Sequence, residues 1–159
     1  MSNAIYKGKI YNANYYPQKG EKSIIIRSRY NQEEEGFLPT GDGRYYKYLS
    51  PKEIEEFYDF NFYAVFGEAR CFILSVSKDM ETMDLEEWGR VLFSRYSFVQ
   101  ETDRGCFLYT GIQLKDADSF VLEIRHLKKP EFKRIGSENE ISLTYEEFVK
   151  KYRSMVTDV

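Results

Sequence analysis

The stretch Phe60-Asn-Phe-Tyr-Ala-Val-Phe-Gly-Glu-Ala-Arg-Cys-Phe-Ile-Leu-Ser-Val-Ser77 decides the fold. Two apolar runs flank Gly67-Glu68, and a glycine at the first central position suits the type II′ turn of a β-hairpin. Such a turn sets the strand register and places Ala64 opposite Cys71. Because side chains alternate along a strand, both faces of this hairpin are largely apolar. We therefore expect the hairpin in the middle of a sheet, covered on each face.

Strand and helix signals extend on both sides of this hairpin. Consecutive isoleucines at 24–26 favour a buried strand, and residues 5–11 and 44–49 give further short strands. Capping boxes predict three helices, which open at Ser50, Asp84 and Thr144. The pattern predicts one α+β domain over residues 5–159, with a mostly antiparallel sheet of about seven strands and three helices.

Each predicted helix has an apolar stripe at helical spacing. The expected buried stripes are Ile54, Phe57 and Tyr58 in the first helix, Leu85, Trp88, Val91 and Leu92 in the second, and Tyr145, Phe148, Val149, Tyr152, Met155 and Val156 in the third. Ser2-Asn3-Ala4 resembles the remnant of an expression tag, so we assign residues 1–4 no part in the fold.

The composition indicates a globular chain with an excess of tyrosine. Hydrophobic residues make up 42% of the 159 and charged residues 31%, which excludes general disorder. There are 14 Tyr and 12 Phe against one Trp. Because tyrosine combines an apolar ring with a polar tip and is enriched at interfaces, this excess is a first indication of a binding protein.

Two cysteines and the absence of apolar spans bound the location of the chain. Cys71 and Cys106 are too few for a disulfide framework, and each lies in an apolar strand pattern. We expect both to be buried free thiols, with a disulfide between neighbouring strands as the alternative. No stretch approaches the ~20 apolar residues of a membrane span, and no signal peptide is recognisable. The expected location is the cytoplasm.

A search for catalytic motifs leaves a single candidate. The chain has no P-loop, no dinucleotide-binding glycine pattern, no CxxC and no HExxH, so no cofactor or metal is expected. His126 is the only histidine and can titrate near neutral pH, but no nucleophile signature lies near it. We expect a structural role for His126 and no enzymatic activity. A small enzyme of unrecognised family, with acids from distant strands, stays open as an alternative.

A second alternative is nucleic-acid binding through the basic stretch 125–134. This stretch carries a net charge of +4 over residues 124–134 and contains Phe132. A sequence pI of 5.4 and the lack of a recognition motif favour a solvated loop there.

Acidic residues concentrate in two segments. Residues 31–59 carry eight acids and three bases, and residues 79–87 carry five acids and no base, whereas residues 1–30 carry six bases and one acid. Such asymmetry predicts a two-signed surface, whose acidic side can attract a basic partner. Rings within the segment can anchor that partner. The candidate partner-binding residues are Glu33, Glu34, Glu35, Asp42, Tyr45, Tyr46, Glu55, Glu56, Asp79, Glu81, Asp84 and Glu86.

A small, motif-free, tyrosine-rich α+β domain with acidic segments is similar to the immunity proteins of bacterial polymorphic-toxin and contact-dependent inhibition systems. The resemblance is one of overall character across the whole chain, and no motif carries it. It implies a protein that binds one toxin domain, often a basic nuclease, and covers its active site. The expected partner is thus a basic toxin domain, with neither membrane nor nucleic acid as a ligand.

Overall fold

The computed structural model describes residues 1–126 and 138–156. In these ranges the chain forms twelve strands, one α-helix and five short 3₁₀ segments. The strand pairs with a defined register are all antiparallel. The predicted α+β class with a mostly antiparallel sheet is confirmed, whereas the predicted seven strands and three helices are wrong.

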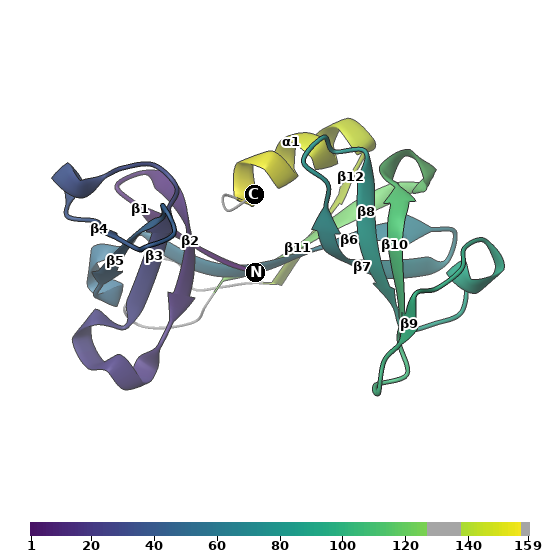
Figure 1. The fold of residues 1–159 in the computed structure, drawn as a ribbon, viewed down its shortest axis with the longest axis horizontal. Coiled ribbons are helices and arrows are strands. Elements are labelled where there is room, and N and C mark those ends of the chain that lie inside the picture. Colours follow the sequence, from purple (N-terminus) through teal and green to yellow (C-terminus); the bar gives the residue numbers. More distant parts are fainter. Residues whose placement is uncertain (127–137, 157–159) are drawn as a thin grey trace. The chain divides into compact units, whose positions relative to one another are not determined.

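The described residues gather into two compact units. The first contains residues 1–60, 124–126, 138–139 and 153–156, and the second contains residues 61–123 and 140–152. Strand β6 (Glu56–Phe66) contributes residues to both units. Figure 1 labels the strands of each unit along the chain.

The first unit is a sheet whose one face covers a small core. Its strand order is β4 (Leu38–Pro39), β5 (Tyr45–Leu49), β3 (Ile24–Ser28), β2 (Lys9–Tyr15), β1 (Ser2–Tyr6) and β6. Short 3₁₀ segments at Pro17–Lys22, Glu33–Glu35 and Pro51–Glu53 lie in its connections. The core consists of Ala4, Tyr6, Tyr11, Ala13, Ile24, Ile26, Phe37, Leu49, Ile54 and Phe57. The isoleucine run therefore forms a strand, as predicted.

The N-terminal segment forms a hairpin where the sequence indicated one strand. Lys7 and Gly8 both have left-handed backbones, with φ of 51° and 73°, and reverse the chain between β1 and β2. The single strand predicted for residues 5–11 is therefore wrong. Strand β1 also includes residues 2–4, and Asn3 is buried with its amide donating to the Met155 carbonyl at 2.7 Å. These residues belong to the folded structure.

The second unit contains the predicted central hairpin. Its strand order is β6, β7 (Ala69–Val76), β8 (Thr82–Glu87), β10 (Phe107–Gln113) and β9 (Gln100–Glu101). Short 3₁₀ segments lie at Leu92–Ser94 and Leu114–Asp116. Strand β11 (Ser119–His126) pairs with β6 and with β12 (Glu138–Leu143), and helix α1 (Tyr145–Met155) follows β12. Phe148 of α1 stacks on Phe120 with ring centroids 4.1 Å apart, and it meets Phe62 of β6 edge to face at 5.3 Å.

The central hairpin has the predicted register. Ala64 pairs with Cys71, and Gly67 has a φ of +59°, as a type II′ turn requires at its first central residue. The prediction that both faces of this hairpin are covered, however, is wrong. The even-numbered side chains of β6 from Phe60 to Phe66 are buried, whereas the opposite face is half-buried and Leu74 is 45% exposed. A register shift between Ile73 and Ser75 leaves Leu74 as an extra residue in β7.

Two of the three predicted helices are absent. The Ser50 capping box is present, but it closes only the turn Pro51–Glu53, and Ile54 already has an extended backbone. The β-branched and aromatic residues that follow favour β6. The predicted helix after Asp84 is instead β8, because its buried side chains recur every second residue. The helix after Thr144 is confirmed as α1, with the Thr144–Glu147 capping box in place.

We expect Phe62→Ala to lower the free energy of unfolding by about 3–5 kcal/mol, because its fully buried ring packs against Phe148 and Tyr152. Equilibrium urea unfolding measures this loss. Leu74→Ala, at a 45% exposed position, is the matched control and should cost less than about 1 kcal/mol. Equal losses for the two variants would mean that the buried face of β6 is assigned wrongly.

Candidate binding surfaces

The second unit exposes a group of large apolar side chains between β8 and β10. We call this group the aromatic patch; its members are Trp88 (62% exposed), Val91 (42%), Phe93 (47%), Phe98 (38%) and Val99 (65%). Phe93 and Phe98 stack with centroids 5.2 Å apart, and both contact the buried ring of Phe107. The Arg90 guanidinium lies over the Phe107 ring at 5.7 Å. The patch thus combines rings with a cation.

A buried carboxylate holds the loop that carries the patch. Glu87, at the end of β8, is only 2% exposed. Its Oε1 accepts hydrogen bonds from the backbone N–H groups of Val91 at 2.6 Å and Leu92 at 3.2 Å. Its Oε2 accepts from the Tyr109 hydroxyl at 3.3 Å. Because a buried carboxylate needs such donors, Glu87 and the loop fix each other.

Glu87 and its surroundings also change the titration of two buried neighbours. Burial raises the pKa of the Cys71 thiol to about 12, and the Glu87 charge adds to this effect. Burial, followed by the charge and hydrogen bond of Glu87, raises the pKa of Tyr109 to about 12. Both Cys71 and Cys106 are free and buried, as predicted.

Sequence reasoning missed the aromatic patch because it read residues 84–92 as a helix. A helix there would bury Trp88 and Val91 and expose Glu87. In the structure Trp88 and Val91 are exposed and Glu87 is buried. Only Leu85 and Leu92 of the predicted stripe are buried. The alternation of Met83, Leu85 and Glu87 was the signal for a strand, but a carboxylate at an inward position hid it.

The first unit has a second surface, on the face of its sheet opposite the core. We call it the tyrosine face; it consists of Asn12, Asn14, Ile25, Arg27, Tyr46 and Tyr48, all half-buried or exposed. The register aligns Tyr46, Arg27 and Asn12 in one row across β5, β3 and β2. Tyr48, Ile25 and Asn14 form the next row. Period-two alternation in the predicted strand 44–49 could have paired Tyr48 with Tyr46.

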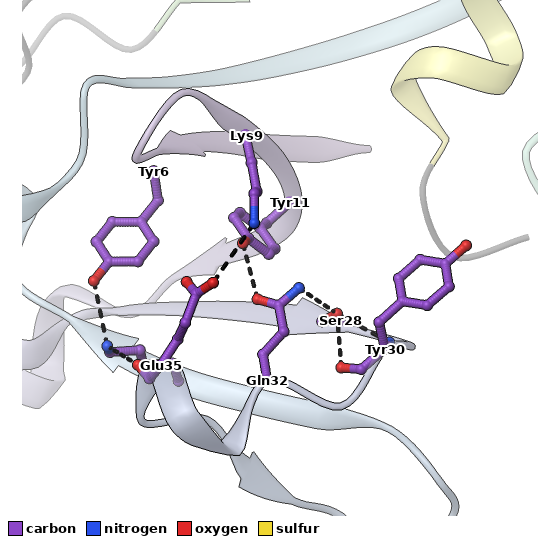
Figure 2. Close-up of polar contacts among 8 residues, drawn as sticks. Tyr6, Lys9, Tyr11, Ser28, Tyr30, Gln32 and Glu35 are labelled. Atoms are coloured by element: carbon purple, nitrogen blue, oxygen red, sulfur yellow. Dashed lines mark hydrogen bonds and ion pairs between the residues drawn. The ribbon is translucent and has the colours of Figure 1, made fainter.

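A pocket of about 210 Å³ lies at one end of the tyrosine face, lined by Lys9, Ile10, Tyr11, Arg27, Ser28, Arg29, Tyr30 and Gln32. Figure 2 shows the polar network beside it: the Tyr11 hydroxyl donates to the Gln32 side-chain oxygen at 2.9 Å, and the Gln32 amide donates to Ser28 Oγ at 3.3 Å. Burial raises the pKa of Tyr11. The ring of Tyr30 points away from this network and is 79% exposed.

Many of the predicted acidic binding residues have local partners in their own unit. In the first unit, Glu35 lies 3.6 Å from Lys9, and Asp42 pairs with Arg44 at 3.7 Å. Hydrogen bonds, chiefly from Thr40, lower the pKa of Asp42. The Glu55 carboxylate accepts from the Gly8 N–H at 3.0 Å.

In the second unit, two of the predicted acids serve turns and strand pairing. Asp84 accepts from Ser75 at 2.9 Å and from the Gly111 N–H at 3.1 Å. Hydrogen bonds, chiefly from Ser77, lower the pKa of Asp79. Four carboxylates have no ion pair or hydrogen bond with described residues. They are Glu33 and Glu34 in the first unit and Glu81 and Glu86 in the second.

The two predicted anchoring rings, Tyr45 and Tyr46, lie on opposite faces of the sheet, because neighbours on a strand point to opposite faces. Tyr45 packs against the core of the first unit, whereas Tyr46 lies on the tyrosine face with its ring 5.5 Å from that of Tyr48. The cations near Tyr48 and Tyr46 are Lys19, 5.1 Å from the Tyr48 ring, and Arg27. On this face Tyr46 lies next to Arg27, its partner in the register.

His126 lies beside Glu56 and Tyr58 in the first unit. Its Nδ1 is 3.5 Å from Glu56 Oε2, and its ring centroid is 5.7 Å from that of Tyr58. The rest of the predicted basic stretch, residues 127–134, lies outside the described residues. In the part of the chain that the structure describes, no group of three or more His, Cys, Asp or Glu side chains could hold a metal ion. No described helix is long and apolar enough to cross a membrane.

Comparison with protein-family models, with curated proteins and with solved structures finds no match to this chain.

The buried Cys71 thiol predicts a loss of stability at alkaline pH. In the unfolded chain the thiol ionises near its ordinary pKa of 9.0, whereas in the folded protein it keeps its proton to about 12. Above pH 9 the unfolded state binds fewer protons, so the free energy of unfolding falls as pH rises. Urea unfolding at pH values of about 8 and about 10 measures the fall. Cys71→Ala should make this fall in the free energy of unfolding smaller. An unchanged fall in the variant would contradict the raised pKa of the Cys71 thiol.

Proposed function

We propose that the chain is a non-enzymatic binding protein that docks onto a protein partner through the aromatic patch. The observation that carries the proposal is the exposure of five large apolar side chains within residues 88–99, three of them aromatic. Exposed apolar side chains that occur singly are ordinary, whereas a contiguous group usually marks an interaction site. The exposed rings of Phe93 and Phe98 stack on each other, and both contact the buried ring of Phe107.

The chemistry of the patch is that of an interface centre. Tryptophan and arginine are enriched among the residues that dominate binding energy, and Trp88 and Arg90 lie in the same loop. The Glu87 hydrogen bonds hold that loop in place before binding. A preorganised loop loses little conformational entropy when a partner binds, which favours affinity.

The resemblance to immunity proteins suggests a bacterial toxin domain as the partner, and a basic one. The carboxylates of Glu33, Glu34, Glu81 and Glu86, which have no ion pair with the described residues, support a basic partner, because unpaired charges contribute most to long-range attraction. Electrostatic attraction raises the association rate, while buried rings slow dissociation. In this proposal the aromatic patch slows dissociation and the four carboxylates raise the association rate.

If a neighbouring gene encodes a toxin domain, surface-based kinetics of binding to that purified domain test the proposal. Phe93→Ser combined with Phe98→Ser should raise Kd at least about tenfold, mainly through faster dissociation. Leu38→Ser, at an equally exposed apolar position in the first unit (54%), is the matched control and should leave Kd unchanged. Unchanged urea unfolding of the variants would show that the fold is intact.

The opposite pattern would overturn the docking surface. If the patch variants bind like the wild type while Glu33, Glu34 and Glu35 changed to Lys slow association, the interface is the acidic segment. If the toxin domain does not bind the wild-type protein at all, the toxin partner is wrong.

A further inference from the structure

We propose that the tyrosine face and the pocket at its end bind single-stranded nucleic acid. This site is in the first unit and uses none of the residues of the aromatic patch, so it is independent of the proposed function. The sheet register determines which side chains share this face.

The tyrosine face carries uncompensated positive charge. Arg27 Nη1 donates to Asn12 Oδ1 at 3.3 Å and to Asn14 Oδ1, and both acceptors are neutral. Lys19 contacts the rings of Tyr16 and Tyr48, at 5.7 and 5.1 Å from their centroids, and lies 3.4 Å from the Tyr48 hydroxyl. Neither cation has a carboxylate partner among the described residues. An anionic ligand would therefore meet attraction without a competing internal ion pair.

The same face offers rings on which bases can stack. Tyr46 and Tyr48 are half-buried and contact each other edge to face, so their orientation is fixed by packing. Proteins that bind single strands combine cations along the backbone with aromatic rings under the bases. A duplex is a poor fit, because its bases are already stacked on one another and cannot reach the rings of a sheet.

The pocket extends this surface at the end of β3. Arg27 belongs both to the tyrosine face and to the pocket, and Arg29 has no partner among the described residues. Tyr30, at the pocket rim, is 79% exposed. A volume of about 210 Å³ is too small for a drug-sized ligand but has room for part of a nucleotide. Arg27 and Arg29 would hold a phosphate, and the ring of Tyr30 would stack on the base.

These placements define a path for the strand. It runs from the pocket, past Arg27 and Tyr46, to Tyr48 and Lys19. The residues named on this path lie on β3, on residues 29–30 just after it, on β5 and on the 3₁₀ segment Pro17–Lys22, so the path stays within one unit. An acidic protein segment could use the same cations but would gain nothing from stacking, and this difference separates the two ligands in the test.

Fluorescence anisotropy tests the proposal with labelled oligouridine and oligothymidine of about twelve nucleotides, titrated with the full chain at about 50 mM salt. The expected result is micromolar binding whose log Kd depends linearly on log salt. Tyr30→Ala and Tyr48→Ala should each weaken binding about five- to hundredfold. Arg27→Gln and Arg29→Gln should each reduce the salt slope by about 0.7. Arg104→Gln and Tyr145→Ala, at positions in the second unit outside both proposed surfaces, are the controls and should change neither the affinity nor the salt slope.

Four outcomes would overturn this site. They are no binding at about 100 μM protein, equal affinity for a duplex of the same length, equal affinity for polyglutamate, and binding that the tyrosine variants leave unchanged. Tyr30→Ala keeps the test decisive if Tyr48→Ala destabilises the fold, because the Tyr30 ring is mostly in solvent. Binding lost only when Lys128, Lys129, Lys133 and Arg134 are neutralised would assign nucleic-acid binding to the basic stretch instead.

Discussion

The structure depends on one constraint, the alternation of side chains along β6. Phe57 joins the core of the first unit, while Phe62, Ala64 and Phe66 are fully buried in the second. A slip of one residue in the pairing of β6 would turn these rings toward the opposite face. The pairing of residues 56–59 with β1 and of residues 63–66 with β7 fixes that register. Because β6 belongs to both units, its register determines which residues of each unit are buried.

Both candidate binding surfaces follow from this distribution of buried residues. In the first unit, tyrosine, asparagine and arginine side chains occupy the face of β2, β3 and β5 opposite the core, where they are half-buried or exposed. In the second unit, Glu87 takes an inward position of β8 and uses its carboxylate to bind the following loop. The buried charge has hydrogen-bond donors, which is the condition under which burial of a carboxylate is tolerated. Glu87 thereby holds the loop after β8, in which the rings of Trp88 and Phe93 are exposed.

Local patterns predicted those parts of the fold where the local signals agree with the apolar pattern. The Gly67 turn, the isoleucine strand and helix α1 were read correctly, because turn chemistry, β-branching and capping agreed with the apolar pattern. The sequence at Ser50 carries a genuine capping box, but the strand-forming residues after it override the helix beyond one turn. At β8 the inward glutamate masked the period of two. The charge counts could not show which acids have local partners, since partners such as Lys9 and Arg44 depend on the tertiary fold.

Residue-resolved amide hydrogen exchange of the free protein tests the central role of β6 most directly. Strands paired on both sides exchange only in large openings, whereas short edge strands exchange by local fraying. We expect the amides of Phe57–Phe66 to exchange among the slowest in the chain, and Gln100 and Glu101 of the edge strand β9 to exchange much faster. Exchange in β6 as fast as in β9 would contradict the central role of β6 in the structure.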